Sequence, residues 1–93
     1  MKAVSISNYG SSSVLKFGEN VETPTPTSTQ VLVKVKATSV NPIDVMKREG
    51  YGRTIFEKQR SFRFPWILGS DVSGVVERVG SKVTKFYEGQ EIW

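Results

Sequence analysis

Residues 30–50, QVLVKVKATSVNPIDVMKREG, change their pattern half-way along and decide the fold class. In the first half, apolar residues recur at every second position with lysines between them, which is the period of a half-buried strand. The second half carries helical signals, because Asn41 is a good N-cap, Pro42 suits the first helical position and Asp44 resembles a capping-box partner. Gly50 predicts the end of this helix after about two turns.

Short strand-like segments lie on both sides of this stretch. Residues 2–10 (KAVSISNYG) and 13–20 (SVLKFGEN) resemble paired strands, and residues 22–29, with two prolines, form a loop. Residues 71–80 (DVSGVVERVG) predict a further strand, in which Gly74 indicates a bulge or a close backbone approach, and EIW is a final short strand. The residues expected in the core are Val72, Val75, Val76, Val79 and Phe86. Five or six short strands and one small helix predict a mainly β fold, as a β-barrel or a curved sheet.

Length and composition exclude several classes of protein. A chain of 93 residues with 38% apolar content suffices for one domain but not for two. No run of eighteen apolar residues occurs, so no transmembrane helix is encoded. Cysteine and histidine are both absent, so the usual structural zinc sites and disulfide bonds cannot form from this chain. The lack of disulfides fits an intracellular compartment.

The net charge of +4 comes from one window of the chain. Residues 47–63 contain six basic and two acidic residues, and the remaining sequence is neutral. Residues 51–64 add aromatic side chains without a clear period, and we interpret them as an ordered loop or irregular excursion. A solvated excursion is the usual form of such a segment, and an interdomain or oligomer contact and a nucleic-acid patch are the alternatives.

Two long motifs carry a resemblance to a known family. Residues 37–52 (ATSVNPIDVMKREGYG) and 64–93 (FPWILGSDVSGVVERVGSKVTKFYEGQEIW) resemble the N-terminal half of the medium-chain dehydrogenase/reductases. Their spelling is similar to the zinc-independent quinone oxidoreductase branch, within it to the reticulon-4-interacting protein 1-like members. The resemblance covers essentially all of residues 1–93. It implies a GroES-like (alcohol dehydrogenase-like) substrate-side domain, a partly open β-barrel with one short helix.

The family binds NADPH mainly in a separate Rossmann domain, which begins with a glycine-rich turn between a strand and a helix. The eight glycines of this chain do not form such a turn. We therefore expect a fragment truncated before the Rossmann domain, in which residues 1–93 form the GroES-like domain without its C-terminal end. Such a chain is expected to be inactive by itself.

The resemblance also assigns functional positions. Zinc-using relatives carry metal ligands at the positions of Asn41 and Ser70, and neither residue here is a thiolate or an imidazole, so no metal is expected. The resemblance implies that Asn41, Asp44 and Tyr51 act in catalysis, and that Asn41 and Ser70 contact the cofactor.

The residues themselves leave simpler roles open. Asn41 can be only a helix cap, Asp44 only a first-turn acid favoured by the helix dipole, and Tyr51 only a packing residue. Arg48 is expected either to pair with Asp44 one turn away or to face an interdomain cleft, and Asp71 to be a buried hydrogen-bond acceptor.

Together these features imply an NADPH-dependent, zinc-independent oxidoreductase that transfers hydride to a quinone or enone. A conjugated acceptor spreads the developing negative charge, so hydrogen bonds can replace a metal ion. The alternatives are a non-catalytic binding module acting through residues 47–63 and an inactive fragment that never meets a partner domain. Nucleic acid is a disfavoured partner. A homodimer of the full-length form and a cytoplasmic or mitochondrial location are both open.

Overall fold

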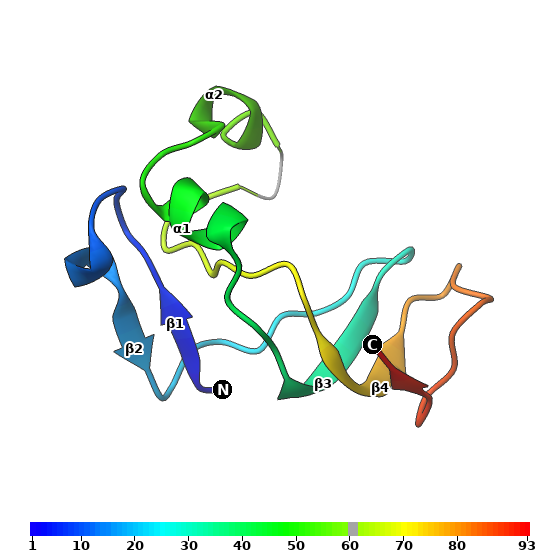
Figure 1. The fold of residues 1–93 in the computed structure, drawn as a ribbon. Coiled ribbons are helices and arrows are strands. Elements are labelled where there is room, and N and C mark those ends of the chain that lie inside the picture. The colour runs from blue at the N-terminus through cyan, green and yellow to red at the C-terminus, as the bar shows by residue number, and fades with distance from the viewer. Residues whose placement is uncertain (60–61) are drawn as a thin grey trace. The chain divides into compact units, whose positions relative to one another are not determined.

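The computed structural model describes residues 1–59 and 62–93, so Arg60 and Ser61 of the basic window lie outside the described residues. The chain divides into a first unit, Met1–Glu22 with Val40–Ser70, and a second unit, Thr23–Ser39 with Asp71–Trp93. The elements follow one another as β1 (Ala3–Ser5), η1 (Ser12–Val14), β2 (Lys16–Gly18), β3 (Val31–Ala37), α1 (Pro42–Arg48), α2 (Arg53–Phe56), β4 (Ser73–Val79) and β5 (Glu91–Ile92). Figure 1 labels all of them except the 3-10 helix η1 and the last strand, β5, which is drawn in red near the C-terminus.

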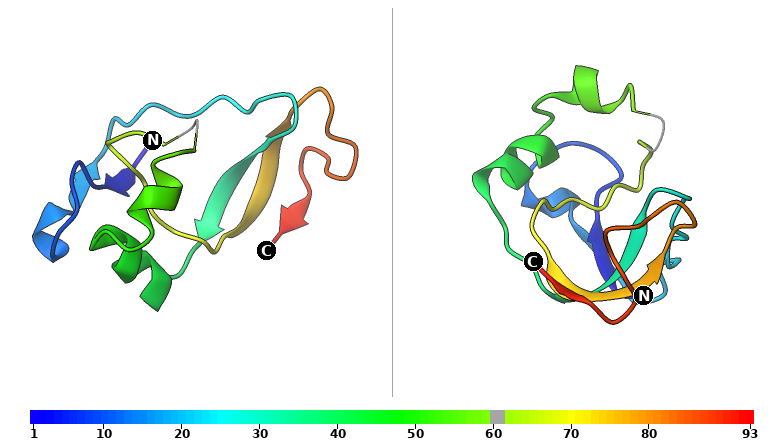
Figure 2. Two further views of the ribbon diagram at one scale, coloured as in Figure 1. Left: turned by 90° about the horizontal axis from the view of Figure 1, so that it is seen from above. Right: turned by 90° about the vertical axis from the view of Figure 1, so that its right-hand side faces the viewer.

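The second unit contains a three-stranded antiparallel sheet in the order β3–β4–β5. β3 pairs with β4 from Val31 opposite Val79 to Ala37 opposite Ser73, with two irregularities in register along the way. Figure 2 shows β5 beside the edge of β4 in both views. β3 and β4 confirm the strands predicted from the alternating residues and from the β-branched run. β-Branched side chains favour strands because they pack well on a pleated surface.

Two glycines allow backbones to approach closely in the second unit. A Cβ atom at Gly74 would overlap the carbonyl oxygen of Lys34 on β3, and one at Gly80 would overlap the carbonyl of Thr27. The N–H of Gly80 also donates to the carbonyl of Gln30 at 2.8 Å. The close approach predicted at Gly74 is confirmed, since no residue with a Cβ atom fits there without displacing its neighbour.

The first unit combines a small hairpin with two helices. β1 and β2 pair antiparallel, with Ala3 opposite Gly18, as their sequences predict. α2 begins after Gly52, which has the left-handed φ of 71°. The interpretation of residues 51–64 as a loop missed α2, because a helix of four residues is too short to show a 3.6-residue period. No helix of the described residues has the length and apolar content needed to cross a membrane.

Aromatic side chains from distant parts of the sequence pack together in the first unit. Phe62 lies edge-on to both Phe64 and Trp66, with ring centroids 5.3 and 5.0 Å apart. Tyr9 packs against Phe64 at 5.4 Å, and Phe56 against Trp66 at 5.9 Å. Edge-to-face pairs at these separations add to the stabilisation that burial provides. We call these five residues the aromatic cluster.

The deepest side chains of the described residues are Ile6 and Val76, which are 0% and 1% exposed. The backbone N–H and C=O of Ile6 both pair with Trp66, at 2.9 and 2.8 Å. Burial was predicted correctly for Val76 but wrongly for Val72 and Phe86, which are 38% and 42% exposed. Both lie outside the paired strands, Val72 before β4 and Phe86 in the loop that leads to β5.

The mainly β class is confirmed, but the expectation of one helix is not. The described strands form two open sheets, of two and of three strands, rather than a closed barrel. Two α-helices accompany them.

Candidate functional site

Asn41 and Asp44 form a capping box at the start of α1. The Asn41 backbone is extended (φ −117°, ψ 162°), as expected for a residue that precedes a proline. Its N–H donates to Oδ2 of Asp44 at 2.9 Å. In the reciprocal half of the capping box, the backbone N–H of Asp44 is paired with the side chain of Asn41. The predicted cap is therefore confirmed.

The carboxylate of Asp44 is buried and joins two separate segments of the first unit. Asp44 is 6% exposed, and its Oδ1 accepts a hydrogen bond of 3.4 Å from Oγ of Ser70, 26 residues further along. Ser70 follows Gly69, whose φ of 128° strongly favours glycine. Three of the four predicted site residues, Asn41, Asp44 and Ser70, thus meet at one carboxylate. Because each carboxylate oxygen accepts from a neutral donor, the burial of this group is compensated.

The structure gives Tyr51 and Arg48 different surroundings. Tyr51 follows α1 and is 59% exposed, and its N–H donates to the carbonyl of Met46 at 2.9 Å. No described contact joins its side chain to the Asp44 carboxylate. The expected ion pair between Arg48 and Asp44 is wrong. Nε of Arg48 donates instead to the Gly10 carbonyl at 3.1 Å, because this carbonyl lies within reach of a guanidinium at the end of α1.

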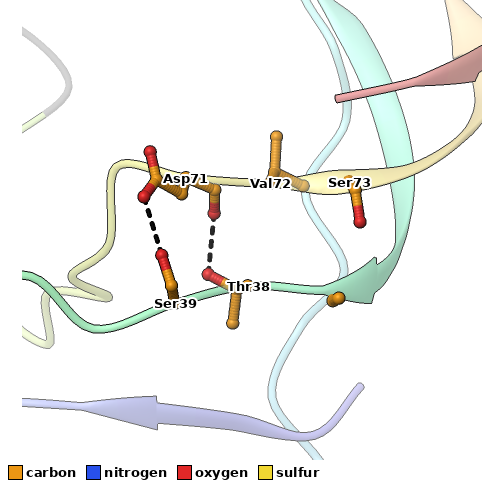
Figure 3. A pocket seen from close by; sticks show the side chains of 6 residues that line it. Thr38, Ser39, Asp71, Val72 and Ser73 are labelled. Atoms are coloured by element: carbon orange, nitrogen blue, oxygen red, sulfur yellow. Dashed lines mark hydrogen bonds between the residues drawn. The ribbon is translucent and has the colours of Figure 1, made fainter.

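A shallow pocket of about 200 Å³ lies in the second unit, between the end of β3 and the start of β4. Figure 3 shows its two hydrogen bonds: Oγ1 of Thr38 donates to the Asp71 carbonyl, and Oγ of Ser39 donates to Oδ2 of Asp71, both at 2.7 Å. Asp71 is an acceptor as predicted, but it is exposed rather than buried, because it lies at the mouth of this pocket. Sequence reasoning missed Thr38 and Ser39. Two adjacent hydroxyl residues at the end of a strand were the only signal.

One contact lies within the basic window, and a second joins the window to the segment between β1 and η1. Nζ of Lys47 lies 4.7 Å from the centroid of the Phe56 ring, and the hydroxyl of Tyr9 donates to Oε1 of Glu57 at 3.0 Å. Desolvation by burial raises the pKa of Tyr9 above its ordinary value of 10.0, and the hydrogen bond and negative charge of Glu57 raise it further. The positive charge of Arg53 acts in the opposite direction on the same pKa. Glu57 is therefore already engaged within the first unit.

Asn41 and Ser70, at which the resemblance places the metal ligands of zinc-using relatives, do not fit a zinc ion. The hydroxyl of Ser70 is directed to Asp44, and Asn41 belongs to the helix cap. Zinc sites are normally built from cysteine, histidine and carboxylate ligands. Within residues 1–59 and 62–93, no three such side chains gather where they could hold a metal ion.

Comparison with known proteins identifies the family to which this chain is similar. Residues 27–93 match the alcohol dehydrogenase GroES-like domain family. The mitochondrial NAD(P)H oxidoreductase RTN4IP1 of Homo sapiens is 43% identical over 102 residues, covering 100% of this chain and 26% of that protein. The 2-methylene-furan-3-one reductase of Solanum lycopersicum is 41% identical, covering 100% of this chain and 23% of that protein.

A solved structure agrees with these sequence matches. The quinone oxidoreductase from Coxiella burnetii superposes with a TM-score of 0.81 at 37% identity, covering 98% of this chain and 28% of that one. The chain thus spans about a quarter of the length of the proteins it matches.

Proposed function

This chain belongs to the alcohol dehydrogenase GroES-like domain family, in the quinone oxidoreductase branch of the medium-chain dehydrogenase/reductases, and we propose that it is the substrate-side domain of an NADPH-dependent, zinc-independent reductase of quinones or enones. The observation that carries the proposal is the buried Asp44 carboxylate, which joins Asn41 to Ser70. The names of the Solanum lycopersicum and Coxiella burnetii proteins, a 2-methylene-furan-3-one reductase and a quinone oxidoreductase, support a conjugated carbonyl acceptor.

The chemistry of such an acceptor suits a site without a metal ion. Nicotinamide supplies the hydride when NADPH is bound. A conjugated acceptor that received a hydride would spread the negative charge to a carbonyl oxygen, and a proton from water would complete the hydroquinone or the saturated ketone. Hydrogen-bond donors aimed at that oxygen then provide the stabilisation that zinc provides elsewhere.

We assign separate roles to the residues of the site. The amide of Asn41 donates to the acceptor or to the nicotinamide, and the hydroxyl of Ser70 lines the cofactor side. Asp44 is a positioning residue rather than a group in contact with substrate, because it is buried and both carboxylate oxygens are engaged. Tyr51, which is exposed just after α1, remains proposed as a residue that contacts the acceptor.

The complete protein is proposed to bind NADPH mainly through a Rossmann domain outside residues 1–93. The chain by itself should then neither reduce quinones nor bind NADPH at micromolar concentration, which calorimetry can check. A saturable low-micromolar isotherm for NADPH would contradict the proposal that the cofactor binds mainly outside residues 1–93. A homodimer and a mitochondrial or cytoplasmic location are part of the same proposal, and the mitochondrial name of the Homo sapiens relative supports the former compartment.

The proposal includes the absence of a bound metal ion. Elemental analysis of the purified chain after dialysis should find no stoichiometric zinc, because the chain offers neither cysteine nor histidine. About one zinc ion per chain would overturn the zinc-independent assignment.

Substitution of Asn41 tests the proposed site directly in the complete protein. Serine can replace asparagine as a helix cap but cannot reproduce the reach of its amide. We expect Asn41→Ser to keep Tm within a few degrees and to lower kcat/KM about tenfold, which corresponds to roughly 1.4 kcal/mol of transition-state stabilisation. Asn41→Asp should lower it further, since a carboxylate cannot donate a hydrogen bond.

Asn20→Ser is the matched control, because Asn20 is an exposed asparagine of the same unit. It should leave both Tm and kcat/KM unchanged. If Asn41→Ser has no effect on quinone reduction whereas Asn41→Ala lowers Tm, Asn41 is a cap only and its proposed catalytic role fails.

A further inference from the structure

The basic window presents an exposed aliphatic side chain between two cations. Ile55 on α2 is 69% exposed, Arg53 precedes it by two residues, and Lys58 follows it by three. Both cations are exposed, and neither forms an ion pair within the described part of the chain, where the recorded pair joins Arg48 to Glu49. Tyr51, 59% exposed, lies at the start of the same excursion. We call Arg53, Ile55 and Lys58 the α2 tip.

The neighbouring residues account for why the tip is apolar and basic. Phe56, next to Ile55, turns inward, where its ring packs on Trp66 and beneath the ammonium group of Lys47. Glu57, the acidic residue of this segment, accepts the hydroxyl of Tyr9. Figure 1 shows α2 on the side of α1 that faces away from β1 and β2. The tip therefore offers positive charge and aliphatic surface together.

We propose that the α2 tip binds the surface of an anionic lipid membrane. Arg53 and Lys58 would interact with negatively charged headgroups, and Ile55 would insert at the boundary between headgroups and acyl chains.

The same cations could attract a nucleic acid, but the aromatic residues argue against that partner. Single strands bind by stacking bases on exposed rings. In this window Phe56 and Phe62 are half-buried and their rings pack in the aromatic cluster, so among the described residues only the ring of Tyr51 is exposed for stacking. The most exposed apolar side chain is instead Ile55, which offers no ring for stacking and suits a hydrocarbon boundary.

The test is co-sedimentation of the 93-residue chain with vesicles of phosphatidylcholine that contain about one-third phosphatidylserine. We expect binding at low salt, weaker binding at high salt, and none to vesicles of phosphatidylcholine alone. Each cation near an anionic surface contributes roughly a fivefold factor, so Arg53→Gln with Lys58→Gln should lower binding roughly 20-fold. Ile55→Ser should lower it by up to about tenfold, even where salt screens the charges.

Matched variants separate this surface from general effects. Lys82→Gln with Lys85→Gln removes the same charge from two exposed lysines of the second unit, and Val40→Ser removes an 81% exposed aliphatic side chain of the first unit. Both should leave vesicle binding within about twofold. Circular dichroism confirms that each variant is folded.

Three results would overturn the proposal. The first is no binding to the anionic vesicles, and the second is an equal loss of vesicle binding in the control and tip variants. The third is nanomolar binding to a single-stranded oligonucleotide by a chain that does not bind the vesicles. The last result would establish nucleic acid as the partner. Because the readout is lipid binding, failure here would leave the proposed reductase function untouched.

Discussion

The two units of this chain are stabilised by different kinds of interaction. In the second unit, β3 and β4 have seven residues each and are joined by antiparallel pairing of their backbones. In the first unit the strands have only three residues, and the aromatic cluster and the Asp44 carboxylate join its segments through side chains. Substitutions that crowd the backbone should therefore damage the second unit most, and loss of side chains should damage the first.

Gly74→Ala should give the largest effect, in the second unit. The added methyl group would overlap the Lys34 carbonyl, a paired backbone atom that no change of rotamer can move. We expect a loss of about 3 kcal/mol or more in the free energy of unfolding, measured by urea denaturation. Gly89→Ala is the control, because that site is open and carries only the strain of its φ of 88°, about 1 kcal/mol. Equal losses would mean that β3 and β4 do not approach as described.

Trp66→Ala should give the next largest effect, in the first unit. Trp66 is half-buried, packs on Phe56 and Phe62, and pairs with the backbone of Ile6. Removal of its ring should cost about 2–3 kcal/mol, somewhat below the value for a fully buried tryptophan. Trp93→Ala, at a residue 96% exposed, should stay within about 0.5 kcal/mol.

Hydrogen exchange locates the damage from Trp66→Ala. Protection of the Ile6 amide should fall more than protection of the β4 amides. A larger loss in β4 would contradict the assignment of Trp66 to the first unit.

Asp44→Ala compares a buried acceptor with an exposed one. It would leave the Asn41 N–H and the Ser70 hydroxyl without their acceptor, which should cost about 2 kcal/mol in thermal or urea unfolding. Asp44→Asn keeps one acceptor oxygen and should cost about half as much. The matched change Asp71→Ala removes an acceptor at an exposed position, where water can replace it, and should cost about 0.5 kcal/mol. Similar losses at both positions would argue against the Asp44-centred site.

Tyr9→Phe should give the smallest effect and a dependence on pH. Loss of the hydrogen bond to Glu57 should cost at most about 1 kcal/mol at neutral pH. The pKa of Tyr9 is raised in the folded state, so the folded chain holds this proton more tightly than the unfolded chain. The contribution is therefore complete below the ordinary value of 10.0 and is lost as pH rises through the folded pKa.

The measurement is the difference in unfolding free energy between wild type and Tyr9→Phe, followed from neutral to alkaline pH. This difference should shrink above about pH 10. Tyr87→Phe, at an exposed tyrosine of the second unit, is the control for the substitution itself and should change the unfolding free energy at neutral pH by less than about 0.5 kcal/mol. A difference that grows with pH would reverse the sign expected from the contact with Glu57.

Much of the second unit was predictable, because its signals lie within a few residues of one another. The alternation in residues 30–38 and the β-branched run in 71–80 each specify a strand, and Gly74 marks a close approach. Less of the first unit was predictable. Arg48 was expected either to pair with Asp44 or to face an interdomain cleft, but its Nε donates to the carbonyl of Gly10, which is 38 residues away in the sequence. Short-range rules cannot choose between such partners.

The sequence by itself determined the mainly β class, the cap at Asn41, the absence of cysteine and histidine and the family resemblance. Each depends on composition or on residues within one turn or one pleat. The tertiary structure alone decided that the hydroxyl of Ser70 reaches the Asp44 carboxylate, that five aromatic rings pack into one cluster, and that Val72 and Phe86 stay exposed. These features depend on which distant segments meet when loops close, and the free energy of that closure is not encoded in any local pattern.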